Sequence, residues 1–342
     1  MTPRGPWCRS VAGLAAAAAA ALAAGCGGAP FNTLTGGGPE ARLLATLGWW
    51  LIALVSLTIV VMGVLIVWGA LRRRGSLTEH LPIDADGGKG WILIGGVAVP
   101  VVVLSVLFFV TLGTLRALPG TVADPAVELE VTAHQWWWEI DYGGRPSERF
   151  SVANEIHVPV GEKIQVRLTS ADVIHSFWVP RLFGKLDAIP GHTNHLVFEA
   201  ERPGVYRGEC AEYCGVQHSN MRLLVVAHEP AEFRSWVEHQ RQPAAMPSDP
   251  ELISGRNAFE QYACALCHTI RGTQARGGVA PDLTHFASRR TLGAGTFPNT
   301  RARLQAWIVN AQGMKPGIKM PKLAQFDGRT LNALAAYLES LE

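Results

Sequence analysis

The sequence predicts a multi-domain protein in which a hairpin of two transmembrane helices precedes an all-β barrel or sandwich and a C-terminal all-α domain. Three observations support this order. Two long uncharged apolar segments lie in the N-terminal third, short alternating runs with Gly/Pro turns follow, and helical patterns fill the C-terminal part. With 342 residues the chain has room for two or three domains. Its hydrophobic content of 48% is concentrated near the N-terminus, which also favours a membrane anchor.

Residues 1–25 are typical of a secretory signal peptide. Arg4 and Arg9 form a positive region, a short Ala/Leu run follows, and small residues come next. The segment LAAGC, ending at Cys26, resembles a bacterial lipoprotein cleavage site and predicts lipidation of Cys26. The alternative is ordinary cleavage nearby, with Cys26 as an incidental thiol.

Residues 40–118 are predicted to form the transmembrane hairpin. Residues 43–71 and 91–115 carry no charge, and each stretch exceeds the roughly 20 apolar residues that a membrane helix needs. Tryptophans lie near their ends, where interfacial aromatic residues belong. The intervening Arg72–Arg74 run places that loop in the cytoplasm, because positive charge favours the inner side. The rest of the chain after residue 118 is therefore expected outside the cell membrane, which agrees with the signal peptide.

Residues 126–230 are predicted to form the all-β domain. The run from Ala126 to Tyr142 alternates over much of its length, and pairs such as Pro190-Gly191 mark turns. Several short strands with such punctuation favour a sandwich or small barrel. Residues 231–250 are polar and contain prolines, so they read as a linker. Residues 251–342 show three helical patterns and are predicted to form the all-α domain.

The segment GECAEYCGVQHSNM gathers soft metal ligands in one loop: Cys210, Cys214, His218 and Met221. A disulfide between the cysteines is possible in an exported domain, but it would leave His218 and Met221 unexplained. Zinc accepts Cys and His, but a nearby Met adds little to a zinc site. Thiolate, thioether and imidazole together favour copper. Two thiolates can bridge two copper ions, with His175 in ADVIHSFWVP as the second histidine.

The segment CALCH supplies a second set of ligands. The C-x-x-C-H pattern of Cys264, Cys267 and His268 reads as covalent attachment of a c-type haem, with His268 as the proximal iron ligand. A redox-active dithiol is the alternative, but the adjacent His and the helical surroundings argue against it. A sixth ligand from Met suits a high-potential electron carrier. Met314 and Met320 are both candidates.

With His175 upstream of it, CAEYCGVQHSNM resembles subunit II of cytochrome c oxidase in its binuclear copper A domain. The resemblance extends over roughly residues 43–229 and implies a cupredoxin-like fold behind the transmembrane hairpin. It implies that Glu212 gives its backbone carbonyl to copper and its carboxylate to a magnesium ion shared with subunit I. The implied side-chain ligands of copper are His175, Cys210, Cys214, His218 and Met221.

The segment HQWWWEIDY belongs to the same resemblance, which implies that Trp136 is the point at which electrons arrive from cytochrome c. Alternation along a strand predicts that Trp136 and Trp138 share one face and that Trp137 takes the other. Core packing is the alternative role for at least one of the three. Asp172 lies three residues before His175 and is either a contact to subunit I or a solvated loop carboxylate.

Residues 251–342 resemble class I cytochrome c. In that family the methionine ligand commonly sits in a Met-Pro dipeptide before the last helix, which favours Met320 over Met314. Pro281 matches the loop proline that supports the proximal histidine, although Ala280 stands where the family usually has Gly. Phe259 and Tyr337 match the packing of the first helix on the last.

The fusion of the two domains resembles subunit II of caa3-type oxidases. It implies a subunit of a proton-translocating cytochrome c oxidase in the bacterial inner membrane, with its copper and haem domains outside. The expected donor is cytochrome c or a quinol-oxidising complex. Oxygen reduction belongs to subunit I, the expected membrane partners are subunits I and III, and no nucleic acid is involved. Quinol oxidases have a related subunit without copper ligands, so the full ligand set argues against them. A copper A nitric oxide reductase or another membrane redox complex is the alternative.

Charge suggests how the two exported domains meet. Residues 126–230 contain 9 Lys and Arg against 14 Asp and Glu, whereas residues 251–342 contain 11 against 6. Our hypothesis is that the basic haem domain docks on the acidic copper domain near Trp136, because complementary charge orients an encounter and a tether raises the effective concentration.

Overall fold

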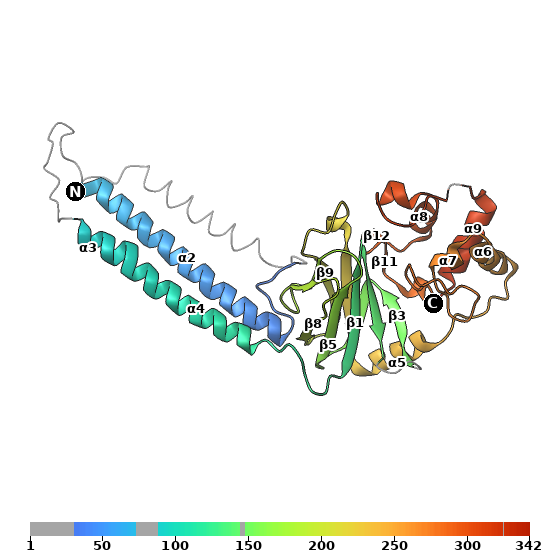
Figure 1. Ribbon diagram of the computed structural model, residues 1–342, viewed down its shortest axis with the longest axis horizontal. Coiled ribbons are helices and arrows are strands. Elements are labelled where there is room, and N and C mark those ends of the chain that lie inside the picture. Colours follow the sequence, from blue (N-terminus) through green and yellow to red (C-terminus); the bar gives the residue numbers. More distant parts are fainter. Residues whose placement is uncertain (1–30, 73–87, 144–147, 324) are drawn as a thin grey trace, which may run out of the picture.

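The computed structural model describes residues 31–72, 88–143, 148–323 and 325–342. The predicted signal peptide, Cys26, Arg73 and Arg74 lie outside the described residues. Figure 1 shows three parts in chain order: a long helical hairpin, a β-sandwich, and a helical C-terminal domain on the side of the sandwich away from the hairpin.

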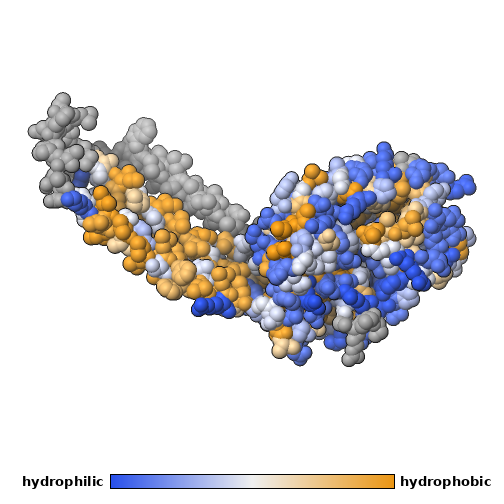
Figure 2. Space-filling model, viewed as in Figure 1, coloured by the Kyte–Doolittle hydropathy of each residue, from blue (hydrophilic) through white to orange (hydrophobic). Residues whose placement is uncertain are grey.

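The hairpin consists of α2 (Pro39–Arg72) and a second continuous helix made of α3 (Lys89–Trp91), the π-helical η1 (Ile92–Ala98) and α4 (Val99–Ala117). Pro100 lies in the first turn of α4 and has no N–H to donate to the turn before it, which accounts for the irregular π-helical segment there. Both helices are long and apolar enough to cross a membrane, with a mean hydropathy of 2.8. Their apolar side chains face outward along the hairpin (Figure 2), as a lipid environment requires.

The start of α2 is fixed to the sandwich. Glu40 is buried and accepts a hydrogen bond from Lys163 Nζ at 3.0 Å, and the same ammonium group lies 3.1 Å from Glu199. Gly37 N donates to Arg181 O at 2.6 Å. These contacts set the height of the sandwich above the hairpin.

Two five-stranded sheets form the sandwich. One has the order β3-β2-β1-β5-β8 and the other β4-β10-β9-β6-β7. The β1–β5 and β4–β10 pairs are parallel, and the remaining pairs are antiparallel. Apolar residues alternate inward on most strands, and Trp138, Phe177 and Phe198 are fully buried between the sheets. The strands are β1 (Val127–His134), β2 (Trp137–Tyr142), β3 (Phe150–Ala153), β4 (Glu155–Pro159), β5 (Ile164–Ser170), β6 (His175–Trp178), β7 (Leu186–Ala188), β8 (Asn194–Phe198), β9 (Gly204–Cys210) and β10 (Arg222–His228).

The segment that we predicted as a linker contains α5 (Pro230–Arg241). This helix packs on the sandwich through Phe233 and Trp236, and the Trp236 ring stacks on His157 with centroids 4.2 Å apart. Its remainder, residues 242–249, is extended and leads into the C-terminal domain.

The C-terminal domain contains α6 (Pro250–Gln261), α7 (Cys264–Cys267), η4 (Phe286–Ser288), α8 (Arg301–Met314) and α9 (Gly328–Glu339). The first and last of these cross closely at Gly255, where a Cβ atom would lie 2.0 Å from Ala333 O. Phe259 and Tyr337 pack edge to face across this crossing, with centroids 6.4 Å apart. A short hairpin of β11 (Thr291–Leu292) and β12 (Phe297–Pro298) is added to the expected helices.

Candidate metal centres

The soft ligands singled out in the sequence meet at one end of the sandwich. Cys210 ends β9 and His175 begins β6, and these strands are paired so that Cys210 lies opposite Phe177. Cys214 follows in the loop after β9, His218 begins the 3-10 helix η3 (His218–Asn220), and Met221 precedes β10. Sheet pairing therefore brings His175 from a distant part of the chain to the cysteine loop.

The two thiols form the centre of this cluster. Cys210 Sγ lies 3.8 Å from Cys214 Sγ, and neither cysteine is in a disulfide. Cys210 Sγ is 3.9 Å from His175 Nδ1 and 3.3 Å from Glu212 O. Cys214 Sγ is 3.7 Å from His218 Nδ1 and 4.0 Å from Met221 Sδ. Each thiol thus has one imidazole and one weaker donor beside it, and this set of soft donors fits two copper ions.

Burial and charge prepare the cluster for metal binding. His175 and Met221 are fully buried, and both cysteines are at most 5% exposed. The pairing with Cys210 and burial raise the pKa of Cys214, whereas the thiol of Cys214 and the imidazole of His175 hold the pKa of Cys210 well below its usual range. This favours the thiolate, which is the form that binds metals.

Asp172 orients the buried histidine. His175 Nε2 lies 2.9 Å from Asp172 Oδ1, which leaves Nδ1 facing Cys210. The other carboxylate oxygen accepts from Gln135 N at 2.7 Å. Burial disfavours protonation of His175, but the hydrogen bonds with Cys210 and Asp172 outweigh it and raise the pKa of the imidazole. A carboxylate behind a histidine ligand commonly fixes its orientation, and sequence reasoning missed this contact.

The three tryptophans differ from one another in their positions. Trp136 lies in the turn between β1 and β2, so the alternation rule of a strand does not apply to it. Its indole Nε1 donates to Cys214 O at 2.9 Å, and Gln135 Nε2 donates to the same oxygen at 2.8 Å. Trp138 points into the core, and Trp137 takes the opposite face and stacks on His134. The predicted alternation therefore holds for Trp137 and Trp138 only.

The C-x-x-C-H residues lie in and just after α7 of the C-terminal domain. Cys264 and Cys267 are one helical turn apart, both are free thiols, and Cys267 is exposed. His268 Nδ1 lies 2.8 Å from Pro281 O, so Nε2 is left to face an iron atom. Burial lowers the pKa of His268 and favours the neutral imidazole, which is the form that binds metals. Two thiols with a neutral imidazole fit a covalently attached haem.

The two methionine candidates flank one loop. Met314 is the last residue of α8, and Met320 lies in the segment that follows it. Gln312 Nε2 donates to Met320 O at 2.8 Å and so fixes the backbone of this segment.

Glu212 is partly exposed beside the exposed Tyr213, on the outer side of the cysteine loop.

Comparisons with known proteins agree with this arrangement. The family model described as cytochrome c oxidase subunit II, periplasmic domain, matches residues 144–228, and the cytochrome c model matches residues 253–342. Cytochrome c oxidase subunit 2 of Alkalihalophilus pseudofirmus is 35% identical over 297 residues, which cover 85% of each chain. The chain belongs to the cytochrome c oxidase subunit 2 family.

Other members of the family are also similar. The Bacillus subtilis cytochrome c oxidase subunit 2 is 30% identical over 292 residues, covering 79% of this chain and 80% of the relative. The crystal structure of the periplasmic domain of subunit II of cytochrome oxidase from Bradyrhizobium japonicum is 34% identical, with a TM-score of 0.33, and covers 35% of this chain and 97% of that one. With its fused cytochrome c domain, this subunit 2 is an electron-transfer subunit of a haem–copper oxidase and a membrane protein with extracytoplasmic domains.

Proposed function

We propose that this subunit 2 accepts electrons at a haem c in residues 251–342 and passes them through a binuclear copper centre in residues 126–230 to subunit I. The donor is cytochrome c or a quinol-oxidising complex. Subunit I, which lies in the membrane with subunit III, reduces oxygen to water and pumps protons. The observation that carries the proposal is the cluster of two buried thiols, one buried and one half-buried imidazole and one buried thioether in a chain that also has the C-x-x-C-H residues.

The proposed copper ligands divide into two sets around the shared thiolates of Cys210 and Cys214. Each ion would also take one imidazole, from His175 or His218, and one weaker donor, from Glu212 O or Met221. The copper pair and the haem supply the one-electron oxidation and reduction when they are bound. The protein's part is to hold these donors on strand ends and in a short loop between β9 and β10, so that little moves when the charge changes.

In the proposed haem site, Cys264 and Cys267 form the thioether bonds and His268 is the proximal ligand. Met320 is the distal ligand. The hydrogen bond from His268 Nδ1 to Pro281 O supports the role of His268, because it fixes the ring and leaves Nε2 free to bind iron.

We propose that Trp136 is the residue through which electrons reach the copper domain. Its hydrogen bond to Cys214 O supports this role, because it connects the indole ring to the backbone of a proposed ligand.

The Glu212 carboxylate is proposed to bind magnesium at the subunit I interface. The exposed neighbour Tyr213 suits such an interface.

The proposed location is the bacterial inner membrane, with two transmembrane passes and both metal domains on the outer side. The two apolar helices support the anchor, and Arg72 at the end of α2 supports a cytoplasmic turn between them. Lipidation of Cys26 would add a second attachment on the outer side.

The test is a metal count and spectra of the full chain, purified in detergent after expression with haem maturation and copper loading. We expect two copper ions per chain with a mixed-valence electron paramagnetic resonance signal, together with one low-spin haem c. A single copper ion, zinc, or a chain without haem would overturn the proposal at the corresponding site.

A further inference from the structure

The C-terminal domain contacts the sandwich right beside the proposed copper ligands. Figure 1 shows the β11–β12 hairpin at one end of the sandwich. Arg222 N donates to Ala294 O at 3.0 Å, so the first residue of β10 is bonded to the tip of that hairpin. Thr296 Oγ1 donates to Asn220 O at 3.2 Å. In the other direction, Gln217 Nε2 donates to Pro316 O at 2.9 Å.

Lys315 is a lysine buried in this contact. It is 2% exposed, and its Nζ donates to Trp136 O at 2.9 Å, Asn220 O at 2.8 Å and Gly293 O at 2.9 Å. An ammonium group has three N–H donors, and here each has a carbonyl oxygen. Two of these oxygens belong to the copper domain and one to the C-terminal domain. Burial lowers the pKa of Lys315 to about 7, so the position is costly unless its hydrogen bonds are kept.

The backbone after Lys315 lies on the indole of Trp136. A Cβ atom added at Gly317 would lie 3.4 Å from Trp136 Cη2 and 3.2 Å from Val216 Cγ2. Gly317 has a φ of +88°, a conformation that glycine adopts readily. Trp136 is only 8% exposed as a result of its surroundings. The same segment continues to Met320, so it joins the proposed iron ligand to the surface of Trp136.

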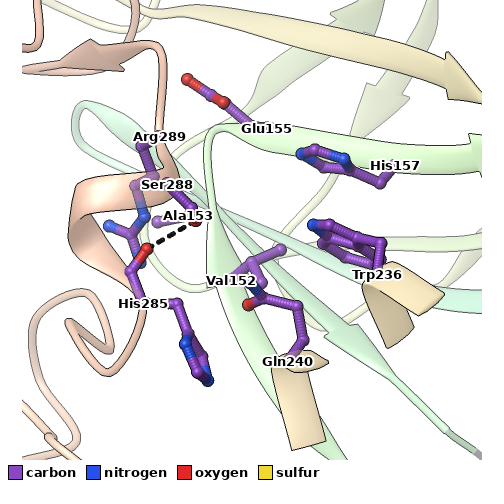
Figure 3. Close-up of a pocket in the computed structure, with 9 residues that line it drawn as sticks. All are labelled: Val152, Ala153, Glu155, His157, Trp236, Gln240, His285, Ser288 and Arg289. Atoms are coloured by element: carbon purple, nitrogen blue, oxygen red, sulfur yellow. Dashed lines mark hydrogen bonds between the residues drawn. The ribbon is translucent and has the colours of Figure 1, made fainter. Parts of the chain in front are cut away.

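Glu155 provides a second attachment at the other side of the contact. Its carboxylate is 3% exposed and accepts from Arg290 N at 2.9 Å, Thr291 N at 3.0 Å and Thr291 Oγ1 at 3.1 Å. Next to it lies a cavity of about 10 Å³, which Figure 3 shows lined by the sandwich, α5 and the C-terminal domain. Two buried charged groups, each bonded to neutral groups of the backbone or a hydroxyl, therefore cross the contact at separate points.

Ion pairs do not account for this contact. Between residues 126–229 and 250–342, the described part of the chain has no Lys or Arg nitrogen within 4.0 Å of an Asp or Glu oxygen, and Arg289 interacts with Glu155 only at longer range. The net charges of the two domains can still steer their approach. The docked position itself depends on directed hydrogen bonds from Lys315 and to Glu155.

We propose that Lys315 is a positioning residue that holds residues 315–318 against Trp136 and so fixes the docked arrangement in which the haem domain reduces the copper domain. The inference rests on the proposed function. In the step that it serves, one electron leaves the ferrous haem iron, which becomes ferric, and joins the mixed-valence copper pair, which becomes fully reduced. No bond is formed or broken and no proton is transferred.

The test uses the whole oxidase complex with its haem and copper bound. Lys315→Met keeps the length of the side chain but removes all three donors, and Lys322→Met is the matched control because Lys322 is an exposed lysine of the same segment. Haem absorption and copper content establish that both centres are loaded. The rate of haem c oxidation after flash photoreduction and the hydrogen exchange of peptides spanning residues 290–296 and 315–318 are then measured.

We expect Lys315→Met to slow haem-to-copper transfer by about tenfold or more and to speed exchange in both peptides, with Lys322→Met unchanged in both measurements. Transfer within twofold of wild type together with unchanged exchange would overturn the proposal.

Gly317→Asn is a second variant, because Asn tolerates positive φ and its side chain separates the backbone from Trp136. It should also slow transfer, and a normal rate would count against the proposal. If wild-type protein itself shows no haem-to-copper transfer, the proposed function fails, whereas the exchange data still test the role of Lys315.

Discussion

Trp136 Nε1 donates a hydrogen bond to the carbonyl oxygen of Cys214 at 2.9 Å, so the residue proposed to receive electrons is bonded to the backbone of a proposed copper ligand. Gln135 Nε2 donates to the same oxygen at 2.8 Å. The turn between β1 and β2 therefore holds the ligand loop with two donors. Because Gln135 donates to the same oxygen, the structural contribution of Trp136 can be tested apart from its proposed role in electron transfer.

Replacing Trp136 by Phe should slow electron transfer without emptying the copper site. Gln135 still donates to Cys214 O in the variant, so the loss of one hydrogen bond should cost about 1 kcal/mol of stability. Haem-to-copper transfer should fall about tenfold or more, equivalent to about 1.4 kcal/mol or more in the barrier. Copper content and flash-induced haem oxidation are the measurements. Trp137→Phe is the control, since Trp137 faces away from the loop, and equal slowing in both variants would argue against a specific role for Trp136.

Replacing Met221 by Leu should change the copper signal while the fold survives. Met221 is fully buried, and a swap of similar volume in a core costs less than about 1.5 kcal/mol. Leu has no sulfur donor, so one of the two proposed copper ions should lose its weak ligand. We expect an altered electron paramagnetic resonance spectrum at nearly unchanged thermal stability. Met246→Leu, at an exposed position, should leave the spectrum as it is; an unaltered spectrum in Met221→Leu would remove Met221 from the ligand set.

The sequence predicts those parts of the structure that leave a local pattern in the chain. The transmembrane helices follow from apolar length alone, and the cysteine loop follows from ligand spacing within one segment. The segment ADVIHSFWVP, which lies upstream of the cysteine loop, supplies His175 as the second histidine ligand. Trp136 was misplaced for a physical reason, since nothing in a run of three tryptophans marks where a strand ends and a turn begins. The sequence allows two roles for Asp172, and its contact with His175 depends on a loop conformation that spacing does not show.

The contact between the domains could not be read from sequence at all. Lys315 lies between Met and Pro in a loop, where a lysine is normally solvated. Glu155 begins β4 and resembles any surface carboxylate in a strand. Their burial depends on the packing of two domains that are separate in sequence, and the net charges indicated only that the domains attract each other. Helix α5 was missed because residues 230–241 are polar, yet Phe233 and Trp236 suffice to hold it on the sandwich.

The choice between the two methionines can be tested by substitution. Met320→Leu should remove the proposed distal ligand and lower the haem potential, because a Met ligand raises it. Met314→Leu should leave the spectrum and the potential unchanged, and it serves as the matched control. Absorption spectra and a redox titration of the full chain measure both. A normal spectrum in Met320→Leu with a perturbed one in Met314→Leu would reverse the assignment.

The stability of the sandwich should fall in acid because of His157. Burial, with the neighbouring His228, lowers the pKa of His157 to about 3, and His157 Nδ1 lies 2.8 Å from His228 Nε2. Above about pH 6.5 the imidazole is neutral in both the folded and unfolded states. Between about pH 6.5 and 3 the unfolded chain binds a proton that the folded chain does not, so the free energy of unfolding decreases as the pH falls, by at most about 1.4 kcal/mol per pH unit. The ring keeps some solvent contact, which makes the true slope smaller.

His157→Phe, which can still stack on Trp236, should flatten the dependence of stability on pH in thermal unfolding followed by tryptophan fluorescence. His192→Phe, at an exposed position, should not. A slope that is the same in all three proteins would show that other groups govern the acid sensitivity.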